Sequence, residues 1–74
     1  MSAPLISYQK TRELTTAALL APGTRLSFNS LKQEVERRAK NGVVDDLVLE
    51  EVLKDLKGED KVSYGSKRAI HWKP

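Results

Sequence analysis

The chain has no cysteine among its 74 residues, and its single histidine is His71. The lack of cysteine excludes disulfide bonds and every zinc site that uses thiolate ligands. One histidine without clustered partners does not make a metal site either. We therefore predict a small domain with no metal and no cofactor, in which aliphatic packing, with or without help from a partner, provides the stability.

Long hydrophobic runs are also missing. The longest apolar stretch, residues 17–22, is far shorter than the ~20 residues that a membrane-spanning helix needs. The N-terminal residues lack the basic start and the apolar core of a signal peptide. We expect a soluble, intracellular domain that does not bind membranes, and the absence of cysteine fits that location.

Catalytic motifs are absent as well. The sequence contains no glycine-rich phosphate loop, no Ser/His/Asp set and no clustered metal ligands. Residues 7–10 satisfy the S-x-x-K pattern, but the motifs that accompany it in enzymes are missing, so we interpret this as a chance match. We predict that the protein is not an enzyme.

What the sequence does contain is one short domain with a mildly basic balance. Its net charge is +3 and its pI is near 9.4, which is consistent with a polyanionic partner. We expect residues 1–7 to form a flexible tail and residues 8–74 to form the domain. Ser7 is suited to cap a first helix over residues 8–20. The core face of that helix is expected to contain Leu14, Ala17 and Ala18.

A short strand and a second helix are expected next. Residues 24–28 alternate apolar and polar side chains, which is typical of a half-buried strand. Ser30 and Gln33 have the spacing of a capping box, and they predict a helix over residues 31–40. The predicted buried side of this helix is Leu31, Val35 and Ala39.

A third helix and a hairpin complete the pattern. Asp45 or Asp46 is a good N-cap, and Gly58 ends the helix. Residues 61–64 and 69–72 alternate around a Gly-Ser turn, which predicts a β-hairpin with one buried face. The core-facing stripe of the third helix is Val48, Leu49, Val52, Leu53 and Leu56.

This order of elements resembles the winged-helix superfamily, in which a helix-turn-helix is extended by a β-hairpin wing. Residues 26–31 resemble the small strand that leads into the second helix of that fold, and residues 52–56 with 61–64 resemble the third helix entering the wing. The resemblance covers residues 8–73 and predicts an α+β fold with three helices, a short first strand and a C-terminal wing. Winged helices bind duplex DNA, RNA or other proteins, and the ending is similar to those of general transcription factors and of the middle subunit of replication protein A.

The leading hypothesis is a domain that binds nucleic acid, with duplex DNA as the favoured form, and with weak sequence specificity. Its predicted contacts to phosphates come from the second helix and the wing. These residues are Arg37, Arg38, Lys40, Lys67 and Arg68. The alternative is that basic residues in the last turn complement the helix dipole, and that charges at the tip of the wing keep the hairpin soluble.

A second hypothesis is a protein-interaction module of a transcription, replication or repair assembly. It rests on the acidic outer face of the third helix. Phosphates repel such a face, and in this respect the sequence differs from a winged helix that reads DNA through its third helix. The predicted contact residues are Asp46, Leu47, Glu50 and Glu51. The alternative is a solvated surface with Glu50 and Lys54 as an i,i+4 pair, on which an isolated exposed leucine is common. We assign Tyr64 and Trp72 to the core, with the Tyr64 hydroxyl reaching water, and expect His71 to be exposed on the opposite side of the hairpin.

Overall fold

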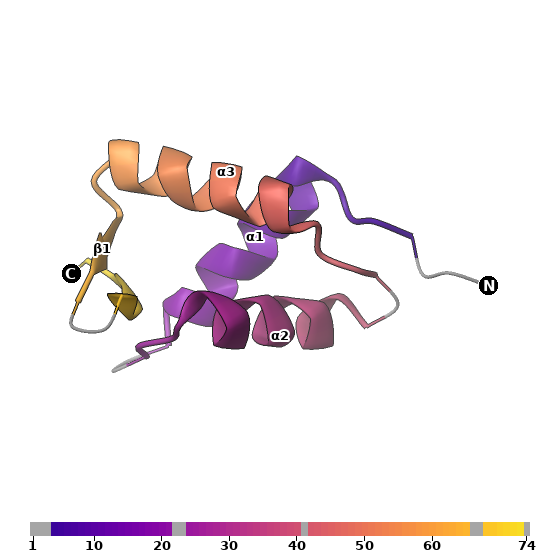
Figure 1. Cartoon of the computed structure of the whole chain (residues 1–74), viewed down its shortest axis with the longest axis horizontal. Coiled ribbons are helices and arrows are strands. Elements are labelled where there is room, and N and C mark those ends of the chain that lie inside the picture. The colour runs from indigo at the N-terminus through magenta and orange to yellow at the C-terminus, as the bar shows by residue number, and fades with distance from the viewer. Residues whose placement is uncertain (1–3, 22–23, 41, 66–67, 74) are drawn as a thin grey trace.

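The computed structural model describes residues 4–21, 24–40, 42–65 and 68–73. It confirms an α+β chain in which an antiparallel hairpin follows the helices (Figure 1). The described elements are α1 (Tyr8–Leu19), α2 (Phe28–Ala39), α3 (Asp46–Gly58), β1 (Val62–Tyr64) and β2 (Ile70–Trp72). Helix α1 crosses behind the space between α2 and α3, and the hairpin lies beyond the C-terminal end of α3 (Figure 1).

Two of the predicted N-caps are confirmed, and the third is wrong. Ser7 accepts a hydrogen bond from the Lys10 amide, and Asp45 accepts one from the amide of Leu47. Helix α2, however, begins one turn before the predicted residue 31. Ser27 caps it, and the Ser27 side chain accepts from the Ser30 amide at 3.2 Å. The earlier start brings Phe28 into the helix, where its ring packs against the core.

The early start of α2 also shortens the predicted first strand. Only Leu26 forms a bridge, which is antiparallel to Ile70. The Leu26 amide donates to the Ile70 carbonyl at 3.1 Å, and the Ile70 amide donates to the Leu26 carbonyl at 2.7 Å. Because Ile70 also pairs with Tyr64 of β1, β2 has hydrogen-bonded neighbours on both sides.

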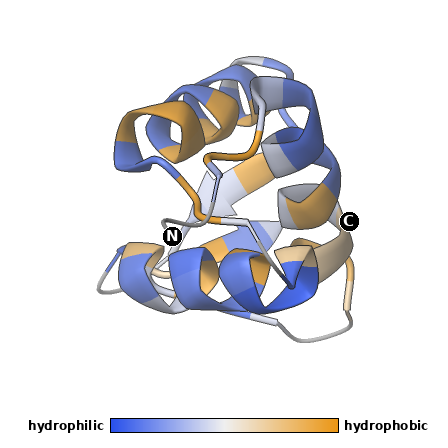
Figure 2. Cartoon of the chain, turned by 90° about the vertical axis from the view of Figure 1, so that its right-hand side faces the viewer, coloured by the Kyte–Doolittle hydropathy of each residue, from blue (hydrophilic) through white to orange (hydrophobic). Residues whose placement is uncertain are grey.

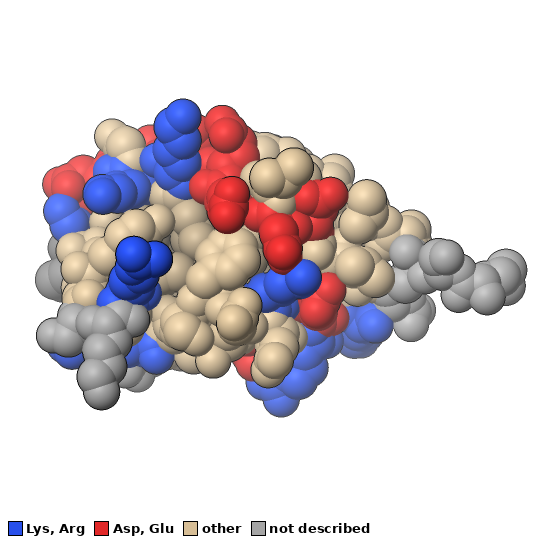
Figure 3. Space-filling model, in the orientation of Figure 1, with Lys and Arg blue, Asp and Glu red and all other residues tan. Residues whose placement is uncertain are grey.

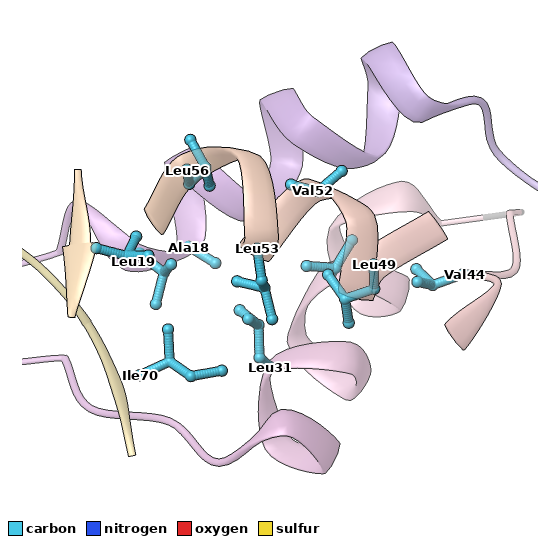
Figure 4. Packing of buried hydrophobic residues seen from close by; sticks show 11 residues of the cluster. Ala18, Leu19, Leu31, Val44, Leu49, Val52, Leu53, Leu56 and Ile70 are labelled. Atoms are coloured by element: carbon cyan, nitrogen blue, oxygen red, sulfur yellow. The ribbon is translucent and has the colours of Figure 1, made fainter. Parts of the chain in front are cut away.

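The core lies where the three helices meet the hairpin. Figure 4 shows Leu53 of α3 and Leu31 of α2 pointing towards one another, with Ile70 of β2 beside them. The hydrophilic residues predominate on the outward sides of the helices (Figure 2). The predicted stripe of α3 is confirmed, with Val48 partly buried at its edge. The buried core contains Ala18, Leu19, Leu31, Val35, Val44, Leu49, Val52, Leu53, Leu56, Val62 and Ile70.

The core face of α1 differs from the prediction at Ala17, which is exposed. Thr11 and Thr15 take the buried face instead, and both are fully buried. Thr11 Oγ1 donates to the Ser7 carbonyl at 2.7 Å, whereas Thr15 Oγ1 has no partner among the residues that the structure describes. Helix α1 is therefore rotated so that two polar residues, and not the predicted alanine, face α2 and α3.

Residues 4–7, assigned to a tail from the sequence, lie against the domain. Leu5 forms a parallel bridge with Val43, the Ile6 amide donates to the Val43 carbonyl at 3.0 Å, and the Val43 amide donates to the Pro4 carbonyl at 2.9 Å. Gly42 permits this approach, because a Cβ at this position would lie 2.3 Å from Ile6 Cγ2. The remaining tail residues, 1–3, lie outside the described part of the chain.

Candidate nucleic-acid interface

The basic residues at the end of α2 are engaged by a carboxylate of their own helix. The Arg37 guanidinium donates to both oxygens of Glu34, at 2.7 and 2.9 Å, and Arg38 Nε donates to Glu34 Oε1 at 3.2 Å. The bond from Arg37 holds the pKa of Glu34 below its usual value. Lys40 follows as the C-cap and is exposed, with a φ of 62°. Arg37 and Arg38 would have to leave Glu34, or share it, in order to hold a phosphate.

Arg68, the described wing residue of the predicted site, does not join this group. Arg68 is exposed and lies at the entrance to β2, while Lys67 lies outside the described residues. Arg68 lines a hollow together with Phe28, in the first turn of α2. Arg37 and Arg38 are in the last turn of the same helix. The structure therefore places the two described parts of the predicted basic site towards opposite ends of α2.

The hollow beside Arg68 lies between α3, the start of α2 and the hairpin. Its volume is about 410 Å³. Figure 3 shows an uncharged area on this face, with basic and acidic side chains along its border. The apolar lining comes from three different elements, so the hollow exists only in the folded chain. The lining residues are Phe28, Glu50, Leu53, Lys54, Tyr64, Arg68 and Ile70.

Tyr64 is the exposed aromatic residue at this hollow, and its assignment to the core is wrong. The residue is 45% exposed, because it stands at the end of β1, where the ring lies against α3 outside the core. Lys57 Nζ lies 4.9 Å from the centre of the ring, a distance at which the cation is attracted by the aromatic face. Trp72 is partly buried and packs against the core, as predicted. His71 is half-buried and not fully exposed.

Three basic side chains thus lie either at the hollow that Tyr64 borders or over the Tyr64 ring. Lys54 and Arg68 line the hollow with Tyr64, and Lys57 covers its ring. We call Lys54, Lys57, Tyr64 and Arg68 the Tyr64 cluster. The sequence contains a partial signal for it: Lys54 and Lys57 are three positions apart on α3, which places them on one side of the helix. Their proximity to the wing depends on the tertiary structure.

Within the described ranges, no carboxylate lies within ion-pairing distance of the three cations of the Tyr64 cluster, whereas most other basic side chains have such a partner. Arg12 donates to Glu59 Oε1 at 2.7 Å, and this bond lowers the pKa of Glu59 to about 2. Lys10, Arg25 and Lys40 also form no described ion pair, but none of them lines the hollow. The remaining pairs join Lys61 to Glu59, Lys73 to Asp60 and Lys32 to Asp46.

The acidic residues predicted as a protein-binding surface lie on the N-terminal half of α3. Asp46 is bound by Lys32 Nζ at 2.7 Å, and this bond raises the pKa of Lys32. Leu47 is 75% exposed, and Glu51 is exposed as well. Glu50 forms part of the hollow's border. Along α3, Asp46, Glu50 and Glu51 lie towards the N-terminus and the two lysines of the Tyr64 cluster towards the C-terminus, as the helix dipole favours. Asp55 lies between those two lysines in the sequence.

Comparison with known proteins identified no relative of this chain. No family model matches the chain, and neither the curated proteins nor the solved structures contain a match. None of the helices in the described ranges is long and apolar enough to cross a bilayer. In the same part of the chain, no three His, Asp or Glu residues are grouped so that they would hold a metal ion.

Proposed function

We propose that this chain is a non-catalytic winged-helix domain that binds nucleic acid through the Tyr64 cluster. The winged-helix assignment is supported by the order of the elements and by the Leu26–Ile70 bridge. That bridge brings the segment before α2 beside the hairpin, at the position where a winged helix has its first strand. The hairpin that follows α3 then corresponds to the wing.

Nucleic-acid binding is supported by the unpaired cations around Tyr64. A phosphate that approaches Lys54 and Arg68 displaces no described carboxylate, whereas one approaching Arg37 must compete with Glu34. Contacts from Lys and Arg to phosphates carry no sequence information by themselves. Binding is therefore expected to be weakly specific and to fall steeply as salt concentration rises. Compared with the residues chosen from the sequence, this interface keeps Arg68 and adds Lys54, Lys57 and Tyr64.

Fluorescence anisotropy with a short labelled duplex DNA, measured over a range of salt concentrations, tests this proposal. The double variant Lys54→Ala/Arg68→Ala should bind at least tenfold more weakly at low salt. Its slope of log K against log salt should fall by roughly 2, since each lost phosphate contact accounts for ~0.9. The matched control is Arg37→Ala/Arg38→Ala, which removes the same charge and should change affinity less. Absence of binding at low salt both to the duplex and to a single strand of the same length, or equal losses in the two variants, would contradict the proposed interface.

A second candidate function rests on the exposure of Leu47. This leucine is 75% exposed and has acidic neighbours in Asp46, Glu50 and Glu51, so a protein partner with an apolar residue and flanking cations would complement it. The triple variant Leu47→Ala/Glu50→Lys/Glu51→Lys should then lose capture of a partner that the unmodified chain retains from an extract. Retained capture by this variant would exclude the acidic half of α3 as the contact surface.

A further inference from the structure

We infer that the hollow beside Tyr64 receives one unstacked base of a single-stranded nucleic acid. In this arrangement the base stacks on Tyr64, and Lys54 and Arg68 hold the neighbouring phosphates. The inference rests on the proposed function and narrows it, because phosphate contacts alone do not distinguish a single strand from a duplex.

The first argument is the apolar lining of the hollow. Leu53 and Ile70 are buried core residues, Phe28 is partly buried against the same core, and all three line the hollow. Its volume of about 410 Å³ lies within the range of ~300–1,000 Å³ that is typical of small-ligand sites. The flat face of a base is free to pack against these apolar side chains only when the base is unstacked. Duplex DNA keeps its bases stacked, and extrusion of one costs free energy.

The second argument is the position of the Tyr64 ring. Tyr64 borders the hollow and the residue is 45% exposed, although the protein has few aromatic residues. Aromatic rings beside a positively charged surface are a common feature of single-strand binding proteins, because every base has a face that stacks on them. The Lys57 ammonium near the ring would then add a further charge for the backbone of the strand.

The third argument is the charge pattern at the border of the hollow. Lys54 and Arg68 are basic, whereas Glu50 is acidic. Glu50 repels phosphates, so the backbone is expected to follow the side of Lys54 and Arg68. Its carboxylate accepts hydrogen bonds and donates none, and a carboxylate pairs well with the amino group of cytosine. Cytosine offers such an amino group, as do adenine and guanine, whereas the only donor on the thymine base is its ring N–H.

The experiment compares the unmodified chain with Tyr64→Ala on two strands of equal length: oligo(dC) and an abasic strand that has the same phosphates but no bases. Oligo(dC) should bind more tightly than the abasic strand. Tyr64→Ala should weaken oligo(dC) binding roughly 5- to 150-fold, the range expected for one lost stacking contact. The affinity for the abasic strand should stay the same, and Tyr64→Phe should restore oligo(dC) binding.

Leu20→Ala serves as the matched control, because it removes another exposed apolar side chain outside the hollow's lining. It should leave the affinity for oligo(dC) unchanged. A circular dichroism melt of each variant separates loss of a contact from loss of the fold. An oligo(rC) probe assigns the site to RNA if it binds more tightly than oligo(dC), and to DNA if it binds less tightly.

The outcomes separate this inference from the proposed function. Equal affinities for oligo(dC), the abasic strand and a duplex, all sensitive to salt and to Lys54→Ala/Arg68→Ala, would overturn the base site and leave the phosphate interface standing. Equal binding of poly(glutamate) and oligo(dC) would assign the hollow to an acidic peptide and overturn both. Absence of binding to any strand or to the duplex would also overturn both.

Discussion

Two threonines on α1 allow a direct test of how hydrogen bonding of buried hydroxyl groups affects stability. Thr11 and Thr15 lie one turn apart and are both fully buried. The Thr11 hydroxyl donates to the Ser7 carbonyl at 2.7 Å, whereas the Thr15 hydroxyl has no partner among the described residues. An unsatisfied buried hydroxyl costs about 1–3 kcal/mol in desolvation. Valine has nearly the same shape as threonine and no hydroxyl group, so Thr15→Val removes this cost.

We expect Thr15→Val to raise the free energy of unfolding by about 1 kcal/mol, which corresponds to a Tm increase of roughly 4–8 °C for a domain of this size. Thr11→Val should lower the free energy of unfolding by about 0.5–1.5 kcal/mol, because it loses a hydrogen bond. The Ser7 carbonyl stays paired in that variant, since the Thr11 amide also donates to it at 2.9 Å. Urea denaturation and thermal melts of both variants measure the effect. Equal changes in the two variants, or a Thr15→Val protein no more stable than the unmodified chain, would refute this account of α1.

Three further predictions concern the close approaches, caps and charges. Gly42→Ala places a methyl group against Ile6 and should lower the free energy of unfolding by about 1–3 kcal/mol. The loss should be smaller when Ile6 is also changed to alanine, because the clash is then relieved. Equal losses in urea denaturation of the two backgrounds would exclude this clash. Ser27→Ala should lower helicity and cost about 1 kcal/mol as the loss of an N-cap, whereas Ser30→Ala should cost less, and the reverse order in circular dichroism melts would place the cap at Ser30. The folded pKa of Glu59 is about 2 against an ordinary 4.5, so its ion pair contributes fully above pH 4.5 and its contribution is lost as the pH falls towards 2. Thermal melts of Glu59→Gln across this range should show a smaller acid-induced drop in Tm, and an unchanged drop would argue against the ion pair.

The helices and the hairpin follow from local patterns in the sequence, and for that reason they were predictable. The stripe of α3 has a helical period, and Ser7 and Asp45 are the residue types that satisfy the free amides of a first turn. The start of α2 was not settled locally, because Ser27 and Ser30 both stand before apolar residues. Ser27 caps the helix because the earlier start lets Phe28 reach the core.

Other features depend on contacts between distant residues, which a single sequence does not specify. The pairing of residues 4–6 with Val43 spans about half of the chain, and no periodicity in a segment so short predicts it. The candidate site was predicted in part: Arg68 was among the basic residues chosen from the sequence, and the helical spacing of Lys54 and Lys57 is readable from it. The meeting of Arg68 with Lys54 and Tyr64 is not, because it requires the hairpin to fold back beside α3.

The bridge between Leu5 and Val43 also has a consequence for attaching the protein to a solid support in a binding assay. It fixes the start of the described chain beside the loop that precedes α3, whereas the Lys73 amide donates to the Lys61 carbonyl at the entrance to β1. The two ends of the described chain therefore lie at opposite ends of the molecule (Figure 1). Attachment through the amino end should leave the hollow facing the solution, while attachment through the carboxyl end brings the support close to it. A binding assay on immobilised protein is therefore expected to depend on which end is attached.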